Sequence, residues 1–151
     1  MDQAIMKARI IWGSMAGSVV LYSVVAEVVA RNPSLQGTRP MSGSSIGIAI
    51  ACVAGLLLAA AYGARRAILG GKLLNLRTSG GFAPPVARLF SAAVFSSLLC
   101  EMAGVAGLAA FLLAGGRTLF YSILAASSAG LLLCFPSRSA WEQYVAEHAN
   151  D

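Results

Sequence analysis

Charged side chains are scarce in this sequence of 151 residues. Asp, Glu, Lys and Arg together make up 11% of it, whereas hydrophobic residues make up 58%, and the mean hydropathy is +0.75. Soluble domains carry about 25% charged residues. The low charge therefore excludes an ordinary soluble domain, and the length allows one domain.

Side chains that bind metals or catalyse reactions are also few. His148 is the single histidine, and Cys52, Cys100 and Cys134 lie in apolar runs without a CxxC spacing. A metal needs clustered ligands, so we expect no metal and no other cofactor, and we expect the cysteines to pack as small hydrophobic residues. Lys72 lacks the Gly and Ser/Thr spacing of a phosphate-binding loop. With no nucleophile–base pair either, the sequence does not indicate an enzyme.

What the sequence does contain is four long apolar runs, at residues 10–29, 46–63, 89–113 and 119–135. A helix of about 20 apolar residues crosses the hydrocarbon core of a bilayer. The pattern predicts one all-α domain over residues 1–151, an integral membrane bundle of four transmembrane helices in the lipid bilayer. No small-residue cleavage motif follows the first run, so we interpret it as a retained span.

The remaining polar segments are a connection at 64–85 and a tail at 136–151. The connection is basic and ends in Gly-Gly and Pro-Pro pairs that break helices; its first part, through Leu76, has the composition of a helix on the membrane surface. In the tail, Ser139 and Glu142 have the spacing of a capping box. One stripe of a short amphipathic helix follows, at Trp141, Tyr144, Val145 and His148. We expect this helix on the headgroup surface or against the basic connection.

Lysine and arginine are distributed unevenly between the two sides of such a bundle. Four spans put both termini and the second connection on one side, with eight basic residues: Lys7, Arg9, Arg65, Arg66, Lys72, Arg77, Arg88 and Arg138. The other side has three, namely Arg31, Arg39 and Arg117. The positive-inside rule then predicts cytoplasmic termini in the inner (cytoplasmic) membrane. Because the positive charge lies at segment ends, we expect no nucleic-acid partner.

Small residues recur at spacings that let helices approach closely in lipid. The helix-packing positions predicted in this way are Gly13, Gly17, Gly47, Gly55, Gly104 and Gly107. The second and fourth runs also share Ala-Gly-Leu-Leu-Leu, at 54–58 and 129–133. Two tandem helical hairpins would explain this repeat, and so would apolar composition alone.

Glu101 lies near the middle of the run 89–113, where a charge costs at least about 2.5–3.5 kcal/mol. Apolar surroundings disfavour the ionised carboxyl, so we expect Glu101 to hold a proton at neutral pH. Ser97 lies one turn earlier on the same helix face, and the two residues form the predicted proton site. Sodium would need more oxygen ligands than they offer. Glu27, at the end of the first run, should instead reach the interface. Alternatively, Glu101 has a structural role and bonds across helices to Ser18, Tyr22 or Ser127.

The residues around Glu101 resemble the ion-binding helix of rotary ATPase c-subunits (proteolipids). In that family an apolar run contains Leu-x-Glu and then Gly-Leu six and seven positions after the Glu, and Leu99, Glu101, Gly107 and Leu108 fit this pattern. The resemblance covers the run 89–113, and the four-span plan is similar to duplicated V-type proteolipids. This sequence departs from the family in three ways. The Glu lies in the third span, the helix that is glycine-rich in the family has fewer glycines at 47–55, and the Arg-(Gln/Asn)-Pro turn is missing.

Two functions are compatible with these features. The resemblance implies a small proton-binding membrane subunit that works in a homo-oligomer or in a larger energy-coupling complex. The alternative is a non-catalytic accessory or scaffold subunit, bound to other membrane-protein subunits through its small-residue faces, its basic connection and its aromatic tail.

Overall fold

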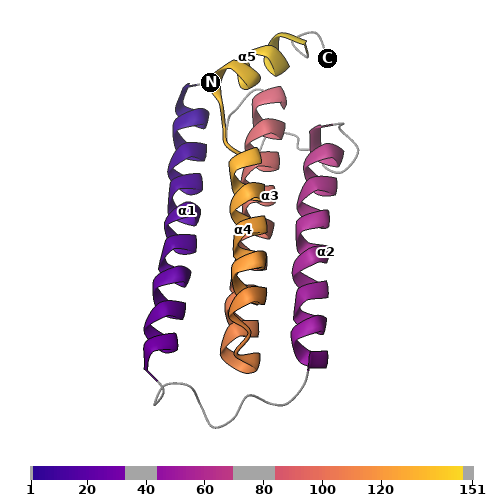
Figure 1. The fold of residues 1–151 in the computed structure, drawn as a ribbon. Helices are drawn as coiled ribbons and strands as arrows, with labels where there is room; N and C mark the ends of the chain where they lie inside the picture. The colour runs from indigo at the N-terminus through magenta and orange to yellow at the C-terminus, as the bar shows by residue number, and fades with distance from the viewer. Residues whose placement is uncertain (1, 33–43, 70–83, 148–151) are drawn as a thin grey trace.

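The computed structural model describes residues 2–32, 44–69 and 84–147, and these contain helices but no strand. The five helices are α1 (Asp2–Arg31), α2 (Ser44–Leu69), α3 (Pro84–Ala114), α4 (Arg117–Leu133) and α5 (Arg138–Glu147). The prediction of an all-helical chain is confirmed for these residues. Helices α1 to α4 run side by side in alternating directions, and α5 lies across the end at which α1 begins (Figure 1).

Three of the helices, α1, α2 and α3, are long and apolar enough to cross a membrane. Helix α4 has 17 residues and qualifies only together with α5, from which it is bent by 54°. At 1.5 Å per residue α4 alone is about 25 Å long, less than the ~30 Å hydrocarbon core. The described chain therefore has three candidate spans, or four if the bent pair is one span, as in a multi-pass membrane protein.

The helices extend past the apolar runs that predicted them. Helix α1 begins at Asp2, α2 continues through Arg65 and Arg66 to Leu69, and α3 begins at Pro84, since proline is tolerated in a first helical turn. Hydropathy marks the part of a helix that suits lipid, whereas the added polar turns depend on neighbouring helices. A surface helix was expected to continue through Leu76. Its part after Leu69 lies outside the described residues, and so does the segment 33–43.

Helix α3 is the centre of the structure and packs against α1, α2, α4 and α5. Within its apolar window 44% of the residues are buried, against 17% in α1 and in α2. Its buried side is rich in small residues, which allow close approach where packing rather than water drives association. The largest cluster of buried residues comprises Val19, Ala26, Ala61, Cys100, Phe111, Phe120, Leu124 and Leu131.

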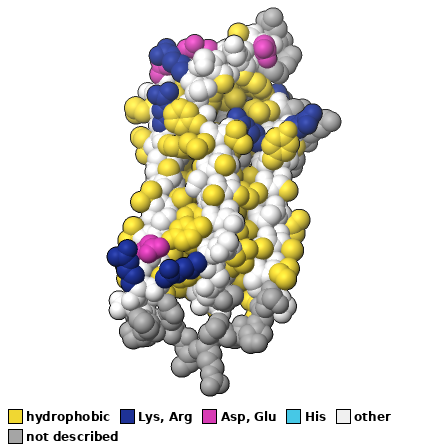
Figure 2. All heavy atoms as spheres, viewed as in Figure 1, with side chains coloured by type: hydrophobic (Ala, Val, Ile, Leu, Met, Phe, Trp, Pro, Cys, Tyr) yellow, Lys and Arg dark blue, Asp and Glu magenta, His cyan; other side chains and the backbone are white. Residues whose placement is uncertain are grey.

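The outer surface has the character of a lipid-facing protein. In the face shown in Figure 2, charged side chains gather at the two ends, and the band between them is apolar. Large hydrophobic side chains are exposed along this band, for example Leu56 at 69% and Leu133 at 76%. A soluble monomer rarely exposes so extensive an apolar surface, which supports placement of these helices in a bilayer.

Side chains from two other helices complete the hydrogen bonding at the C-terminal end of α4. Pro136 cannot continue the helix, so the last carbonyl groups need partners. Backbone N–H groups of Cys134 and Phe135 satisfy the carbonyls of Gly130, Leu131 and Leu132. The indole N–H of Trp12 also donates to the Leu131 carbonyl at 2.7 Å, and the Arg65 guanidinium donates to that of Leu133. Together these bonds fix α1 and α2 against the end of α4.

We expect Trp12→Phe to lower the free energy of unfolding by about 1 kcal/mol, because the part-buried bond to Leu131 is lost. The measurement is reversible unfolding in mixed micelles, followed by circular dichroism. Tyr62→Phe is the matched control, since Tyr62 is 69% exposed on α2. A Trp12→Phe effect no larger than that of Tyr62→Phe would show that the indole bond contributes nothing.

Helix α5 caps the ends of α1 and α3. Trp141 is 4% exposed and packs against Ala4, Ile5, Ala8, Val86 and Leu89. Tyr144 donates to the Leu69 carbonyl at 2.9 Å, where the basic connection begins. The predicted capping box is wrong, because the helix already includes Ser139 and the Glu142 carboxylate accepts from Arg138 at 2.7 Å. His148 lies outside the described residues.

Candidate functional site

Glu101 lies near the middle of α3, and its half-buried carboxylate accepts a hydrogen bond from Tyr22 of α1. The phenol oxygen is 3.2 Å from Oε1 of Glu101. Tyr22 is itself half-buried, so the bond lies deep in the apolar band. It joins two neighbouring helices at the depth where polar groups are most costly to leave without a partner.

The Tyr22 ring packs against α3 at Gly104. A Cβ atom at Gly104 would lie 3.7 Å from two ring carbons of Tyr22 and 3.3 Å from Oγ of Ser127. Gly104 is three residues after Glu101, on the same side of the helix. The contact with the Tyr22 ring is at ordinary van der Waals distance, and the closer approach at Gly104 is that of Ser127 from α4.

The buried serines near Glu101 bind the backbone instead of the carboxylate. Ser96 donates to the Ala92 carbonyl at 2.6 Å, and Ser127 of α4 donates to the Cys100 carbonyl. Ser97, the predicted partner of Glu101, is 2% exposed and makes no hydrogen bond to Glu101 in the structure. Of the cross-helix partners that the sequence left open, the structure brings Tyr22 to Glu101.

No cation neutralises Glu101 within the described part of the chain. The ion pairs there join Arg31 to Glu27, and Arg138 to Asp2 and Glu142. Nor does any group of three metal-binding side chains occur among these residues. Among the described residues, the polar partner of the Glu101 carboxyl is therefore the Tyr22 phenol.

Glu101 lies at the edge between the buried and the exposed sides of α3. Leu98, Met102 and Val105 nearby on the helix are 44%, 48% and 39% exposed. Ser97 and Gly104, also within one turn, are buried. The carboxyl is therefore close to the surface that faces lipid or another protein, beside α1.

The predicted packing glycines have different surroundings. A Cβ at Gly107 would lie 2.9 Å from Cγ2 of Ile123, so α3 and α4 are in close contact there. Gly47 is buried. The three remaining positions are Gly13, Gly17 and Gly55. Nothing lies within 4 Å of a Cβ atom built at any of them. These three make no close contact with the residues that the structure describes.

Sequence reasoning missed Gly130, where a Cβ would lie 2.7 Å from Sγ of Cys100. The available signal was the shared pentapeptide, since Gly130 in 129–133 corresponds to Gly55 in 54–58. The corresponding glycines are not equivalent in the structure, because Gly130 packs against α3 and Gly55 borders open space.

A second polar cluster joins the C-terminal end of α1 to the N-terminal end of α4, at the end of the structure away from α5. The Tyr121 hydroxyl donates to Glu27 at 2.5 Å, Arg31 is 3.6 Å from the same carboxylate, and Arg117 donates to the Ala30 carbonyl at 3.3 Å. The Glu27 side chain is 44% exposed. Each group has a partner, and the cluster works as a structural tie.

No protein-family model matches the chain, and no curated protein or solved structure is significantly similar to it. The geometry around Glu101 is therefore the main indication of what the chain does.

Proposed function

We propose that this chain is a small subunit of a membrane complex and that its Glu101 binds and releases a proton. The hydrogen bond between Tyr22 and Glu101, deep in the apolar band, is the observation that carries the proposal. The chain crosses the inner membrane four times, at residues 10–29, 46–63, 89–113 and 119–135, and both termini and the tail 136–151 lie in the cytoplasm.

The arrangement of the helices supports an even number of passes. The start of α1 and helix α5 lie at the same end of the structure (Figure 1). Lys7, Arg9 and Arg65 belong to this end, and a basic end of a bundle faces the cytoplasm under the positive-inside rule.

The partners of the carboxyl suit a proton better than a metal ion. A phenol both donates and accepts hydrogen bonds, so Tyr22 can accompany Glu101 in its ionised and its protonated form. Sodium would require several oxygen ligands, whereas the nearby hydroxyls of Ser96 and Ser127 are engaged with backbone carbonyls. The resemblance to c-subunits points to the same chemistry and to work in an oligomer.

The test is whether Glu101 carries a proton in lipid at neutral pH. Infrared spectra of the reconstituted protein should contain the carbonyl stretch of a protonated carboxylic acid, and Glu101→Gln should remove it. Glu27→Gln is the control, because Glu27 is ion-paired at the helix end and should not contribute to this band. A spectrum in which only carboxylate bands respond to Glu101→Gln would reject the proposal.

One observation favours the alternative function, a non-catalytic accessory or scaffold subunit. Gly13, Gly17 and Gly55 have open space around them, and small residues of this kind commonly contact a second helix in membranes. In that case the Tyr22–Glu101 bond only locks α1 to α3. Mild extraction of the native complex would then yield a heteromeric assembly whose activity is unchanged by Glu101→Gln.

A further inference from the structure

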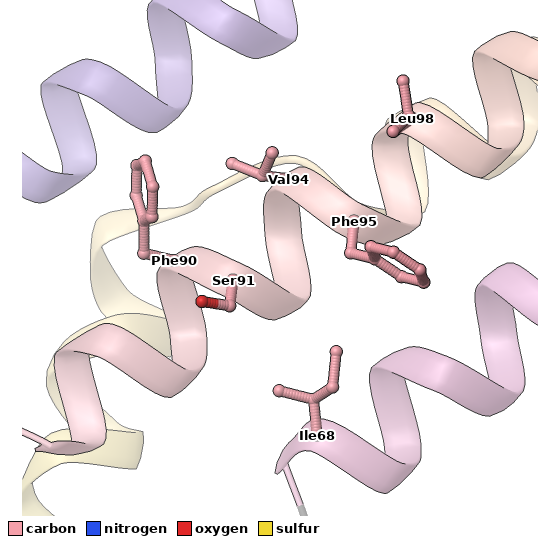
Figure 3. A pocket seen from close by; sticks show the side chains of 6 residues that line it. All are labelled: Ile68, Phe90, Ser91, Val94, Phe95 and Leu98. Carbon is pink, nitrogen blue, oxygen red and sulfur yellow. The ribbon is translucent and has the colours of Figure 1, made fainter. Parts of the chain in front are cut away.

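An apolar hollow opens on the outer surface between the last turn of α2 and the first half of α3. Its volume is about 240 Å³, and it is lined by Ile68, Phe90, Ser91, Val94, Phe95 and Leu98. The side chains of Ile68 and Phe95 approach it from α2 and α3 respectively (Figure 3). Glu101 does not line it, so the hollow is separate from the site proposed above.

The hollow contains one hydroxyl group among hydrocarbon side chains, that of Ser91 (Figure 3). Other serines of the bundle, such as Ser96 and Ser128, donate to the carbonyl four residues earlier. Ser91 makes no hydrogen bond to any described residue in the structure. Its hydroxyl is therefore available to a ligand that enters the hollow.

Positive charge lies near the hollow, toward the end of the bundle. Arg88 is one turn before Ser91 on α3, and Arg66 precedes Ile68 on α2, whereas the Arg65 guanidinium binds the Leu133 carbonyl of α4. The sequence of α2 contains no acidic residue, and the single acid of α3 is Glu101. Within the described residues neither Arg66 nor Arg88 forms an ion pair. Of the described acids at this end, Asp2 and Glu142 pair with Arg138, and Glu147 lies at the end of α5.

We propose that this hollow binds an anionic phospholipid of the surrounding bilayer. One acyl chain occupies the space between Ile68 and Phe95, the Ser91 hydroxyl donates to the ester region, and the headgroup phosphate lies beside Arg88. Basic residues next to apolar surface at a membrane interface are typical of such sites. The charge around Arg88 selects an anionic lipid over a zwitterionic one.

The test is native mass spectrometry of delipidated protein in detergent, titrated with phosphatidylglycerol or with phosphatidylcholine. We expect the first phosphatidylglycerol to bind at least about fivefold more tightly, the effect of roughly one basic residue at a membrane surface. Arg88→Gln should abolish this preference and Arg88→Lys should retain it. Ser91→Leu, which fills the hollow, should weaken the binding of both lipids.

Arg31→Gln is the control, because Arg31 lies at the opposite end of α1 with a side chain that is 82% exposed. It should leave the preference unchanged. Equal affinity for the two lipids, or equal losses from Arg88→Gln and Arg31→Gln, would overturn the proposal. So would unchanged phosphatidylglycerol binding in Ser91→Leu, because the headgroup would then bind without the hollow.

Discussion

A membrane-permeant carbodiimide should label this protein at Glu101, and Glu101→Gln should abolish the labelling. A carbodiimide reacts with a protonated carboxylic acid in apolar surroundings, and the half-buried Glu101 carboxyl lies at the lipid-facing edge of α3 without a paired cation. Asp2, Glu27 and Glu142 are ion-paired at the helix ends and should react little. The measurement is the mass of the modified peptide after digestion of the membrane-embedded protein.

Tyr22→Phe sharpens this experiment. The phenol donates to Oε1 of Glu101, so it engages an oxygen of the group that the carbodiimide must reach. Its removal should therefore increase labelling at a fixed pH. Tyr121→Phe, which removes the equivalent phenol from Glu27, should leave labelling at Glu101 unchanged. Labelling that persists in Glu101→Gln, or that is equal in Tyr22→Phe and the wild type, would contradict the proposed site.

The positions of the helices follow from hydropathy, but their contacts do not. Apolar runs predict four helical segments because lipid imposes both length and composition on a span. The helix ends were less predictable, since Asp2 and Leu69 belong to polar turns that neighbouring helices stabilise. In the tail, the spacing of Ser139 and Glu142 suggested a cap at Ser139, whereas the helix begins two residues earlier than such a cap allows, at Arg138, which pairs with Glu142.

The candidate site was predictable in part. The depth of Glu101 follows from the sequence, because one acid in a long apolar run must lie away from water. Its partner did not follow, since Ser97 on the same helix and Tyr22 on another both had suitable groups. In the structure the phenol of Tyr22 reaches the carboxyl, and its ring packs against α3 at Gly104. Which side of a helix meets which neighbour is a property of the tertiary packing.

The two copies of Ala-Gly-Leu-Leu-Leu provide a matched test of that packing. Gly130→Val should lower the free energy of unfolding by about 3 kcal/mol, the upper end of typical overpacking costs. Its Cβ would lie 2.7 Å from Sγ of Cys100 and 3.6 Å from Cδ2 of Leu58. Gly55→Val, in the same pentapeptide, should change the stability by less than about 0.5 kcal/mol, since nothing lies within 4 Å of its Cβ.

A double-mutant cycle identifies the contact responsible. Cys100→Ala removes the sulfur that Gly130→Ala would meet, so the cost of Gly130→Ala should be smaller in that background. Additive effects would show that the contact between Gly130 and Cys100 does not hold α4 against α3. The free energy of unfolding is measured in mixed micelles. Gly130→Ala is compared with the wild type, and the double variant is compared with Cys100→Ala.

The variant Gly55→Val also tests whether α2 contacts a second subunit. If Gly55 borders lipid, the substitution leaves the stability and the size of the extracted assembly unchanged. If Gly55 contacts a second subunit, its valine prevents close approach of the helices, and the assembly dissociates while the single chain remains as stable as before. A loss of assembly in Gly55→Val with full carbodiimide labelling at Glu101 would place the subunit contact on α2, away from the proton site.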